Sequence, residues 1–143
     1  MTISEIKHQF MAMRNGVVAD TLRNAGISYP VIFGLQLPQI SQIAREIGKN
    51  RQLAEALWQD VNVRESRLLA PALMNVEEVT FADAMKMIDE LKTREEADIL
   101  IFRLLRFHPE ITQIHSAVRE IASGRVSSDL SHYTLTAIER FLD

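Results

Sequence analysis

The residue that first suggests chemistry is Asp98, a carboxylate within a strongly apolar segment of the chain, residues 97–107. In an α-helix, Asp98 would lie on the apolar side, close to Ile101 and Phe102. A carboxylate in such surroundings is costly unless it is paired or hydrogen-bonded. Asp98 is therefore either a structural residue, held by an arginine or by the start of a neighbouring helix, or a site carboxylate that faces a cleft.

Four arginines form two pairs with a spacing of three residues: Arg64 with Arg67, and Arg103 with Arg106. Residues three apart share one face of a helix. Each pair could therefore present two guanidinium groups to the phosphates of a nucleic acid. The alternative is ordinary solvated charge, which nearby glutamates neutralise.

Other kinds of site lack the residues that they need. The sequence contains no cysteine, which excludes disulfides, thiolate metal sites and cysteine nucleophiles. The serines form no nucleophile elbow, and the five glycines are scattered at predicted helix ends instead of forming a phosphate-binding loop. The four histidines have no ligand-like spacing: they are His8, His108, His115 and His132. We therefore expect no metal and no cofactor, and we expect His108, which precedes Pro109, to be solvated.

Charge and hydrophobicity limit the class of partner. The 143 residues carry a formal net charge of -3 and have a pI of about 5.8. A domain devoted to nucleic acid usually has a basic excess, so any such surface must be a local patch, and a protein partner is nearly as well supported as DNA. No segment approaches the ~20 apolar residues of a membrane span, and no signal peptide is visible. We expect a cytoplasmic protein that does not bind membranes.

Hydrophobic periodicity and capping residues predict about eight helices, mostly paired through short loops, in a single domain that spans residues 1–143. The predicted caps are Thr2 with Glu5, Asn50, Asn62, Thr80 with Asp83, Thr93 with Glu96, and Ser127 or Ser128. Helical pairs of this kind bury their apolar faces against neighbouring pairs. The pattern therefore predicts an all-α fold, an α-solenoid or superhelix of about four helical pairs.

Three further features concern the path and packing of the chain. Residues 26–35 contain Pro30 and read as extended; since no other segment offers a pairing partner, we expect a loop packed on the core. Pro71 lies inside a predicted helix and should bend it, because proline removes one backbone hydrogen bond. Trp58 ends a short amphipathic helix and is expected to fill the core instead of stacking on bases.

Three motifs follow one another in the central part of the chain, roughly residues 30–100. They are Phe33-Gly34-Leu35 with Leu37-Pro38 and Ile43-Ala44, then Ala56-Leu57-Trp58, then Arg64-Glu65-Ser66-Arg67-Leu68-Leu69-Ala70 with Val79-Thr80. In this order the motifs resemble those of the DNA alkylation repair enzymes, a family of HEAT-like alkylpurine DNA glycosylases. The resemblance implies HEAT-like helical pairs, a solenoid whose concave face holds duplex DNA, and a third possibility for Arg67, a structural bridge between neighbouring repeats.

The same resemblance places a hydrocarbon side chain where the family has its catalytic carboxylate. In the family, an aromatic-Asp-x-x-Asp pattern follows the second capping threonine, and its second aspartate stabilises the cationic sugar as the damaged base leaves. The corresponding stretch is Ala97-Asp98-Ile99-Leu100-Ile101, so the catalytic position is Ile101 and only Asp98 remains. A gapped alignment would bring in Glu95 or Glu96 instead, although Glu96 is already expected to cap a helix.

Two functions are compatible with these observations. The first is a non-catalytic binding module of the alkylation-repair type, which holds duplex DNA or a protein on its concave face through Arg64, Arg67, Arg103 and Arg106. The second is a DNA glycosylase that excises alkylated purines such as 3-methyladenine and 7-methylguanine, with Asp98 as its catalytic carboxylate. An apolar last helix could also stack on a second copy, so a homo-oligomer is a further expectation.

Overall fold

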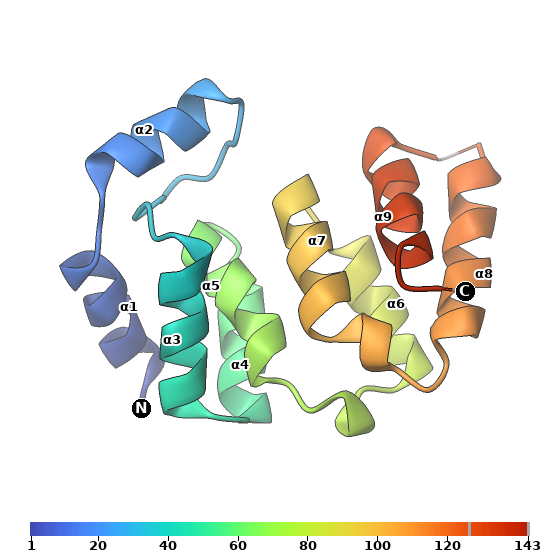
Figure 1. Cartoon of the computed structure of the whole chain (residues 1–143), viewed down its shortest axis with the longest axis horizontal. Helices are drawn as coiled ribbons and strands as arrows, with labels where there is room; N and C mark the ends of the chain where they lie inside the picture. Colours follow the sequence, from blue (N-terminus) through green and yellow to red (C-terminus); the bar gives the residue numbers. More distant parts are fainter. Residues whose placement is uncertain (126, 143) are drawn as a thin grey trace. The chain divides into compact units, whose positions relative to one another are not determined.

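The structure is a computed structural model that describes residues 1–125 and 127–142. Within these residues it contains nine α-helices and no β-strand, so the predicted all-α fold is confirmed with one helix more than expected. The chain divides into two compact units, Met1–Met74 and Asn75–Asp143, and each is described by itself (Figure 1). A continuous superhelix of about four helical pairs in a single domain stays a prediction.

The first unit is built around a short central helix. Its elements are α1 (Ile3–Ala12), α2 (Gly16–Asn24), α3 (Leu37–Ile47), α4 (Arg51–Gln59), α5 (Arg64–Leu69) and the 3-10 helix η1 (Ala70–Leu73). Helix α5 packs on α3, α4 and η1, and all six of its residues are buried. This central position therefore buries charged side chains as well as leucines.

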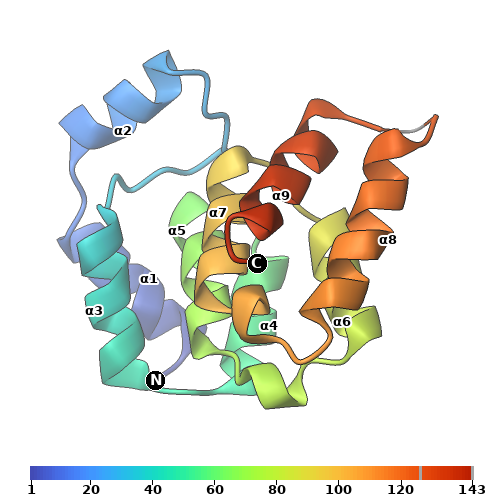
Figure 2. The same ribbon diagram turned by 45° about the vertical axis from the view of Figure 1, so that its right-hand side comes forward.

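A long loop, residues 25–36, connects α2 at the edge of this unit to α3 (Figure 2). Its residues Tyr29 and Ile32 pack with Ala19 of α2 in a small apolar cluster. The prediction of a loop that lies on the core is therefore confirmed.

The same loop makes one contact that the sequence did not reveal. Val31 forms an isolated parallel bridge with Val63, in which Val31 N donates to Asn62 O and Arg64 N donates to Val31 O. A bridge of one residue pair has no periodic signature, which is why no partner was expected. The prediction that Asn62 caps α5 is wrong, since Val63 is the N-cap residue and no side chain caps this helix.

Gly34 is required where the loop passes the start of α2. Its φ of +89° lies in the left-handed region, and a Cβ at this position would collide with the carbonyl oxygen of Asn15. The two segments are joined there by a hydrogen bond of 2.8 Å from Asn15 N to Phe33 O. Gly34 therefore permits the close approach that fixes the path of the loop.

The bend predicted at Pro71 takes the form of a change in helix type. The α-helix α5 ends at Leu69, and the chain continues as the 3-10 helix η1 with Pro71 near its start. Proline is tolerated there because the first turn of a helix has no use for its missing N–H.

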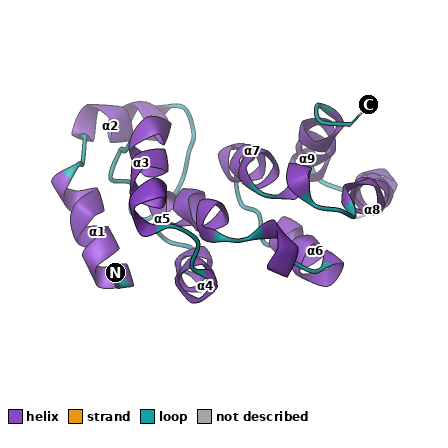
Figure 3. Cartoon of the chain, turned by 60° about the horizontal axis from the view of Figure 1, so that its bottom comes forward, coloured by secondary structure: helices purple, strands orange, loops and turns teal. Residues whose placement is uncertain are grey.

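The described residues of the second unit form four α-helices and two 3-10 helices. They are η2 (Val76–Glu78), α6 (Phe81–Asp89), α7 (Arg94–Arg103), η3 (Leu105–Phe107), α8 (Ile111–Ser123) and α9 (Asp129–Glu139). Helix α9 lies between α7 and α8 and packs on both (Figures 1 and 3). Helix α9 therefore brings its own side chains next to those of α7.

Three helix starts in the second unit, those of α6, α7 and α9, follow the sequence closely, whereas one helix end does not. Three predicted caps are confirmed: the hydroxyl of Thr80 accepts from Asp83 N, that of Thr93 from Glu96 N and that of Ser128 from Ser131 N. The helix predicted across residues 97–107 is shorter, because Leu104 leaves helical dihedral angles (φ -134°, ψ -66°) and η3 follows. The last residues of this segment therefore form a 3-10 turn and do not continue α7.

His108 is buried, and the prediction that it is solvated is wrong. Its Nε2 lies 2.6 Å from Val79 O, and its Nδ1 accepts a hydrogen bond of 3.0 Å from Glu110 N. The imidazole turns inward because both of its nitrogens find backbone partners there. Helix α8 begins at Ile111, two residues after Pro109.

Candidate functional site

Asp98 lies in the middle of α7, and the partners of its carboxylate come from α9 and from the residue that follows it. The Tyr133 hydroxyl donates a hydrogen bond of 2.7 Å to Oδ2, and Arg140 Nη1 lies 3.8 Å from Oδ1. The Asp98 side chain is 43% exposed. Asp98 is thus held by an arginine, as one alternative expected, but its carboxylate also remains accessible to solvent.

Tyr133 is positioned between Asp98 and a second arginine. The Arg94 guanidinium carbon lies over the Tyr133 ring, 4.8 Å from its centroid. The hydrogen bond to the Asp98 carboxylate raises the pKa of Tyr133 above its ordinary value; partial burial adds to the rise and Arg140 opposes it. Tyr133 therefore remains a hydrogen-bond donor. We call these four residues the α7–α9 polar strip: Arg94, Asp98, Tyr133 and Arg140.

Ile101, the residue at the catalytic position of the resemblance, lies in the core with no exposed surface. Ala97, at the aromatic position of the same pattern, is equally buried. Glu96, one of the two alternatives from a gapped alignment, is 1% exposed, and its Oε1 accepts a hydrogen bond of 3.0 Å from Lys92 N at the start of α7. None of these three positions presents a carboxylate to solvent. Glu95, the other alternative, is partly exposed in the first turn of α7.

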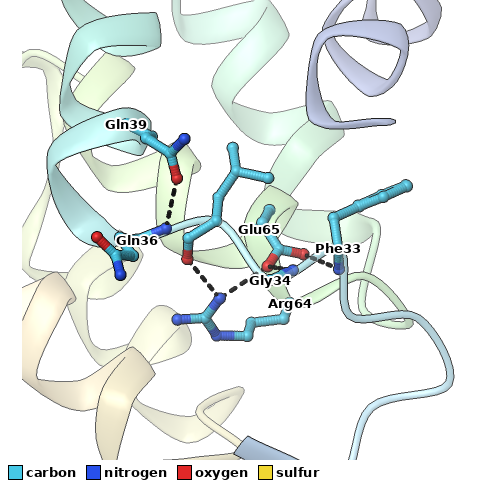
Figure 4. Close-up of polar contacts among 7 residues, drawn as sticks. Phe33, Gly34, Gln36, Gln39, Arg64 and Glu65 are labelled. Atoms are coloured by element: carbon cyan, nitrogen blue, oxygen red, sulfur yellow. Dashed lines mark hydrogen bonds and ion pairs between the residues drawn. The ribbon is translucent and has the colours of Figure 1, made fainter. Parts of the chain in front are cut away.

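Arg64 is buried in the first unit, next to the equally buried Glu65 (Figure 4). Arg64 Nη1 donates to Leu35 O at 2.9 Å and to Glu65 Oε2 at 2.7 Å. The Glu65 carboxylate also accepts the backbone N–H groups of Phe33 and Gly34, at 3.0 and 3.1 Å. The ion pair therefore anchors the loop that leads into α3.

Arg67 is buried in α5, as Arg64 is, and is held by Trp58. Its guanidinium lies 3.7 Å from the centroid of the Trp58 ring, and its Nη1 donates a hydrogen bond of 2.7 Å to Trp58 O. Arg67 is 1% exposed and Trp58 is 3% exposed. The exposed arginine pair expected at Arg64 and Arg67 is therefore not present at the surface, and Trp58 belongs to the core, as expected.

Arg103 and Arg106 lie at the end of α7 and in η3, among exposed phenylalanines. The Arg106 guanidinium carbon is 4.3 Å from the ring centroid of Phe107, 4.4 Å from that of Phe102 and 5.1 Å from that of Phe141. Arg103 lies over the ring of Phe102 at 5.3 Å. We call the central group the Phe–Arg cluster: Phe102, Arg106, Phe107 and Phe141.

Sequence reasoning missed Arg94 at the start of α7, Phe107 of η3, and three residues of α9 and the positions just after it. Tyr133, Arg140 and Phe141 complete the polar strip and the Phe–Arg cluster, and none of them stood out from the sequence. Their spacing of seven and eight residues places them on one helix face, which is a usable signal. These residues reach α7 only because α9 packs on it, and hydrophobic periodicity does not reveal that tertiary contact.

Among the residues that the structure describes, no group of three or more histidine, aspartate or glutamate side chains could hold a metal ion. Within the same residues, none of the helices combines the length and the apolar character needed to cross a membrane.

Comparison with known proteins gives one finding. The family model described as DNA alkylation repair enzyme matches residues 6–122, which is most of the chain and includes all of the motifs that carried the resemblance. The comparisons found no match among curated proteins or among solved structures.

Proposed function

The chain belongs to the DNA alkylation repair enzyme family, and from this premise we propose that it binds duplex DNA without excising bases. The binding surface is on the second unit, where the polar strip and the Phe–Arg cluster both contain arginines. A protein partner, which the net charge of -3 makes nearly as well supported as DNA, is the alternative outcome of the binding experiment.

The observation that carries the absence of catalysis is the burial of Ile101. A glycosylase of this family needs an anionic group beside the cationic sugar of the transition state, and a buried hydrocarbon side chain cannot supply it. Asp98 is a poor substitute, because electrostatic stabilisation is strongest for a preorganised charge in a water-excluded site. Its carboxylate is instead 43% exposed, with Arg140 as its counter-ion.

The arginines support binding to phosphates. Arg94, Arg103, Arg106 and Arg140 belong to α7, η3 and the end of α9, and each is at least partly exposed. Guanidinium groups bind phosphate oxygens through parallel N–H donors. The second unit as a whole carries thirteen acidic and eight basic residues. These arginines are thus local positive charges on an acidic unit, and binding should be moderate and sensitive to salt.

The first experiment measures binding of a fluorescent duplex by anisotropy, at salt concentrations from about 50 to about 200 mM. We expect an affinity that falls as salt rises, and an Arg94→Ala/Arg140→Ala double variant whose salt dependence is shallower by about two phosphate contacts. Arg119→Ala, an exposed change on α8, is the matched control and should bind as the wild type does. Absence of duplex binding at low salt, or an unchanged slope in the double variant, contradicts the proposal.

A second candidate function, alkylpurine glycosylase activity, is favoured by one observation: Asp98 is accessible and receives a hydrogen bond from Tyr133. Incubation with duplex containing 3-methyladenine or 7-methylguanine separates the two candidates. The binding proposal predicts no free base above the blank without protein. Release by the wild type that is lost in Asp98→Asn would overturn the proposal and establish the enzyme.

A further inference from the structure

Three exposed aromatic rings lie together at one place on the second unit. Phe102 is 44% exposed, Phe107 is 58% exposed and Phe141 is 40% exposed. The rings of Phe102 and Phe141 have centroids 6.3 Å apart and are tilted by 49°, so neither ring covers the face of the other. Single exposed apolar residues are ordinary, but a contiguous group of large rings indicates a surface that binds something.

Arg106 gives this surface its charge. Its Nε donates a hydrogen bond of 2.7 Å to Phe102 O, which fixes the guanidinium between the three rings. Within the described part of the chain, no carboxylate pairs with Arg106, and its terminal amino groups remain as donors. The Phe–Arg cluster therefore combines apolar ring faces with a positive charge held in one orientation.

This combination suits unpaired nucleotides. Proteins that bind single strands use aromatic side chains on which bases stack, together with cationic groups that contact the backbone. A base inside a duplex has both faces covered by its neighbours and a terminal base pair exposes only one, whereas an unpaired base can turn either face toward an exposed phenylalanine. We propose that the Phe–Arg cluster binds unpaired bases of single-stranded DNA, at an end, a gap or an overhang that adjoins the duplex.

The inference rests on the proposed DNA-binding function and adds the form of DNA that the protein prefers. The polar strip and the arginines contact the phosphates of the duplex, whereas the phenyl rings of the cluster contact bases that lie outside it. The preference for an overhang should consequently depend on bases and not on charge.

The experiment compares three probes of equal phosphate count by anisotropy: a blunt duplex, a duplex with a thymidine overhang, and the same duplex with an abasic overhang. Wild-type protein should bind the thymidine overhang roughly tenfold more tightly than either other probe. The abasic overhang is the decisive control, since it keeps the phosphates and lacks the bases.

Matched variants test the cluster itself. Phe102→Ala/Phe107→Ala should bind all three probes with the affinity of the wild type for blunt duplex, whereas Phe107→Trp should keep the overhang preference. Ile121→Ala removes an exposed apolar side chain of α8, 41% exposed in the wild type, and should change nothing. Because Phe107 is more than half exposed, the single variant Phe107→Ala should fold with an unchanged midpoint of thermal unfolding. This single variant replaces the double variant in the binding test if the double variant does not fold.

Several results would overturn the inference. Equal affinity for the thymidine and abasic overhangs is one, and unchanged overhang binding by a folded Phe107→Ala variant is another. A wild-type dimer in sedimentation that Phe107→Ala dissociates, without any base-dependent binding, would assign the cluster to a second copy of the chain instead.

The probes also separate this inference from the proposed function. Binding of blunt duplex without preference for thymidine would leave the proposed function intact and end the inference. Binding of the overhang probe alone would support the inference and contradict binding to duplex.

Discussion

The two arginine pairs have the same spacing but lie in opposite surroundings. Arg64 and Arg67 are enclosed in α5, where backbone carbonyls, a carboxylate and an indole ring satisfy their guanidinium groups. Arg103 and Arg106 lie near the surface, where phenylalanine rings flank them. A spacing of three residues decides which side chains share a helix face, while the elements around the helix decide whether that face is buried.

Net charge would have suggested the reverse arrangement. The first unit carries eight basic and six acidic residues, and the second carries eight basic and thirteen acidic residues. The more basic unit nevertheless buries its arginine pair, and the more acidic unit exposes its own. Local placement, and not the charge of a unit, therefore determines where a phosphate could be contacted.

The largest expected effect comes from breaking the buried pair in the first unit. Glu65→Ala leaves Arg64 buried without its carboxylate and frees two loop N–H groups, so the free energy of unfolding should fall by about 3–5 kcal/mol. Urea denaturation measures this change. Glu55→Ala is the control, because Glu55 forms an exposed ion pair with Arg51 and should cost less than about 1 kcal/mol. Equal losses in the two variants would mean that Glu65 does not anchor the loop.

An intermediate effect sharpens the contrast between the pairs. Arg67→Lys removes a planar group stacked on Trp58 in the core and should cost about 2 kcal/mol of stability. Arg106→Lys makes the same chemical change among partly exposed rings and should cost less than about 1 kcal/mol. Chemical denaturation of both variants measures the two losses in unfolding free energy. A larger loss in Arg106→Lys than in Arg67→Lys would show that the buried arginine is not the more important one for stability.

The smallest effect concerns pH. An unfolded tyrosine ionises near pH 10, and the hydrogen bond to Asp98 raises the pKa of Tyr133 in the folded chain. Between these two pKa values the unfolded chain binds fewer protons, so stability should fall as pH rises through the window above about 10. The Tyr133→Phe variant has no hydroxyl to ionise, so it should not show this part of the fall in stability.

The measurement for Tyr133 is the difference in unfolding free energy between wild type and variant, followed from about pH 8 to about pH 11. Lysine titration is common to both proteins and cancels in the difference. A constant difference across this range would show that the hydroxyl does not depend on the Asp98 carboxylate.

Local chemistry made much of the fold predictable. Thr80, Thr93 and Ser128 cap helices because their hydroxyls accept from amides that a helix leaves unpaired. Pro71 marked the end of regular α-helix for an equally local reason. His108 and Asn62 were misjudged, since the partners that place them lie about thirty residues away in the sequence.

The candidate site was less accessible to sequence reasoning. Asp98, Arg103 and Arg106 were identified because they interrupt an apolar segment. Tyr133 and Phe141 acquire their roles only from the packing of α9 on α7. The burial of Arg64 and Arg67 likewise depends on three neighbouring elements, and a helix of six residues is too short for periodicity to indicate that it is enclosed on all sides.

The buried imidazole of His108 has a spectroscopic consequence. A carbonyl only accepts and an amide only donates, so the ring must carry its proton on Nε2 and keep Nδ1 bare. One tautomer gives two widely separated nitrogen-15 resonances, whereas an imidazole in water averages them. His108 is thus a native NMR reporter, and the merging of its two signals would register the moment at which the segment before α8 detaches from Val79.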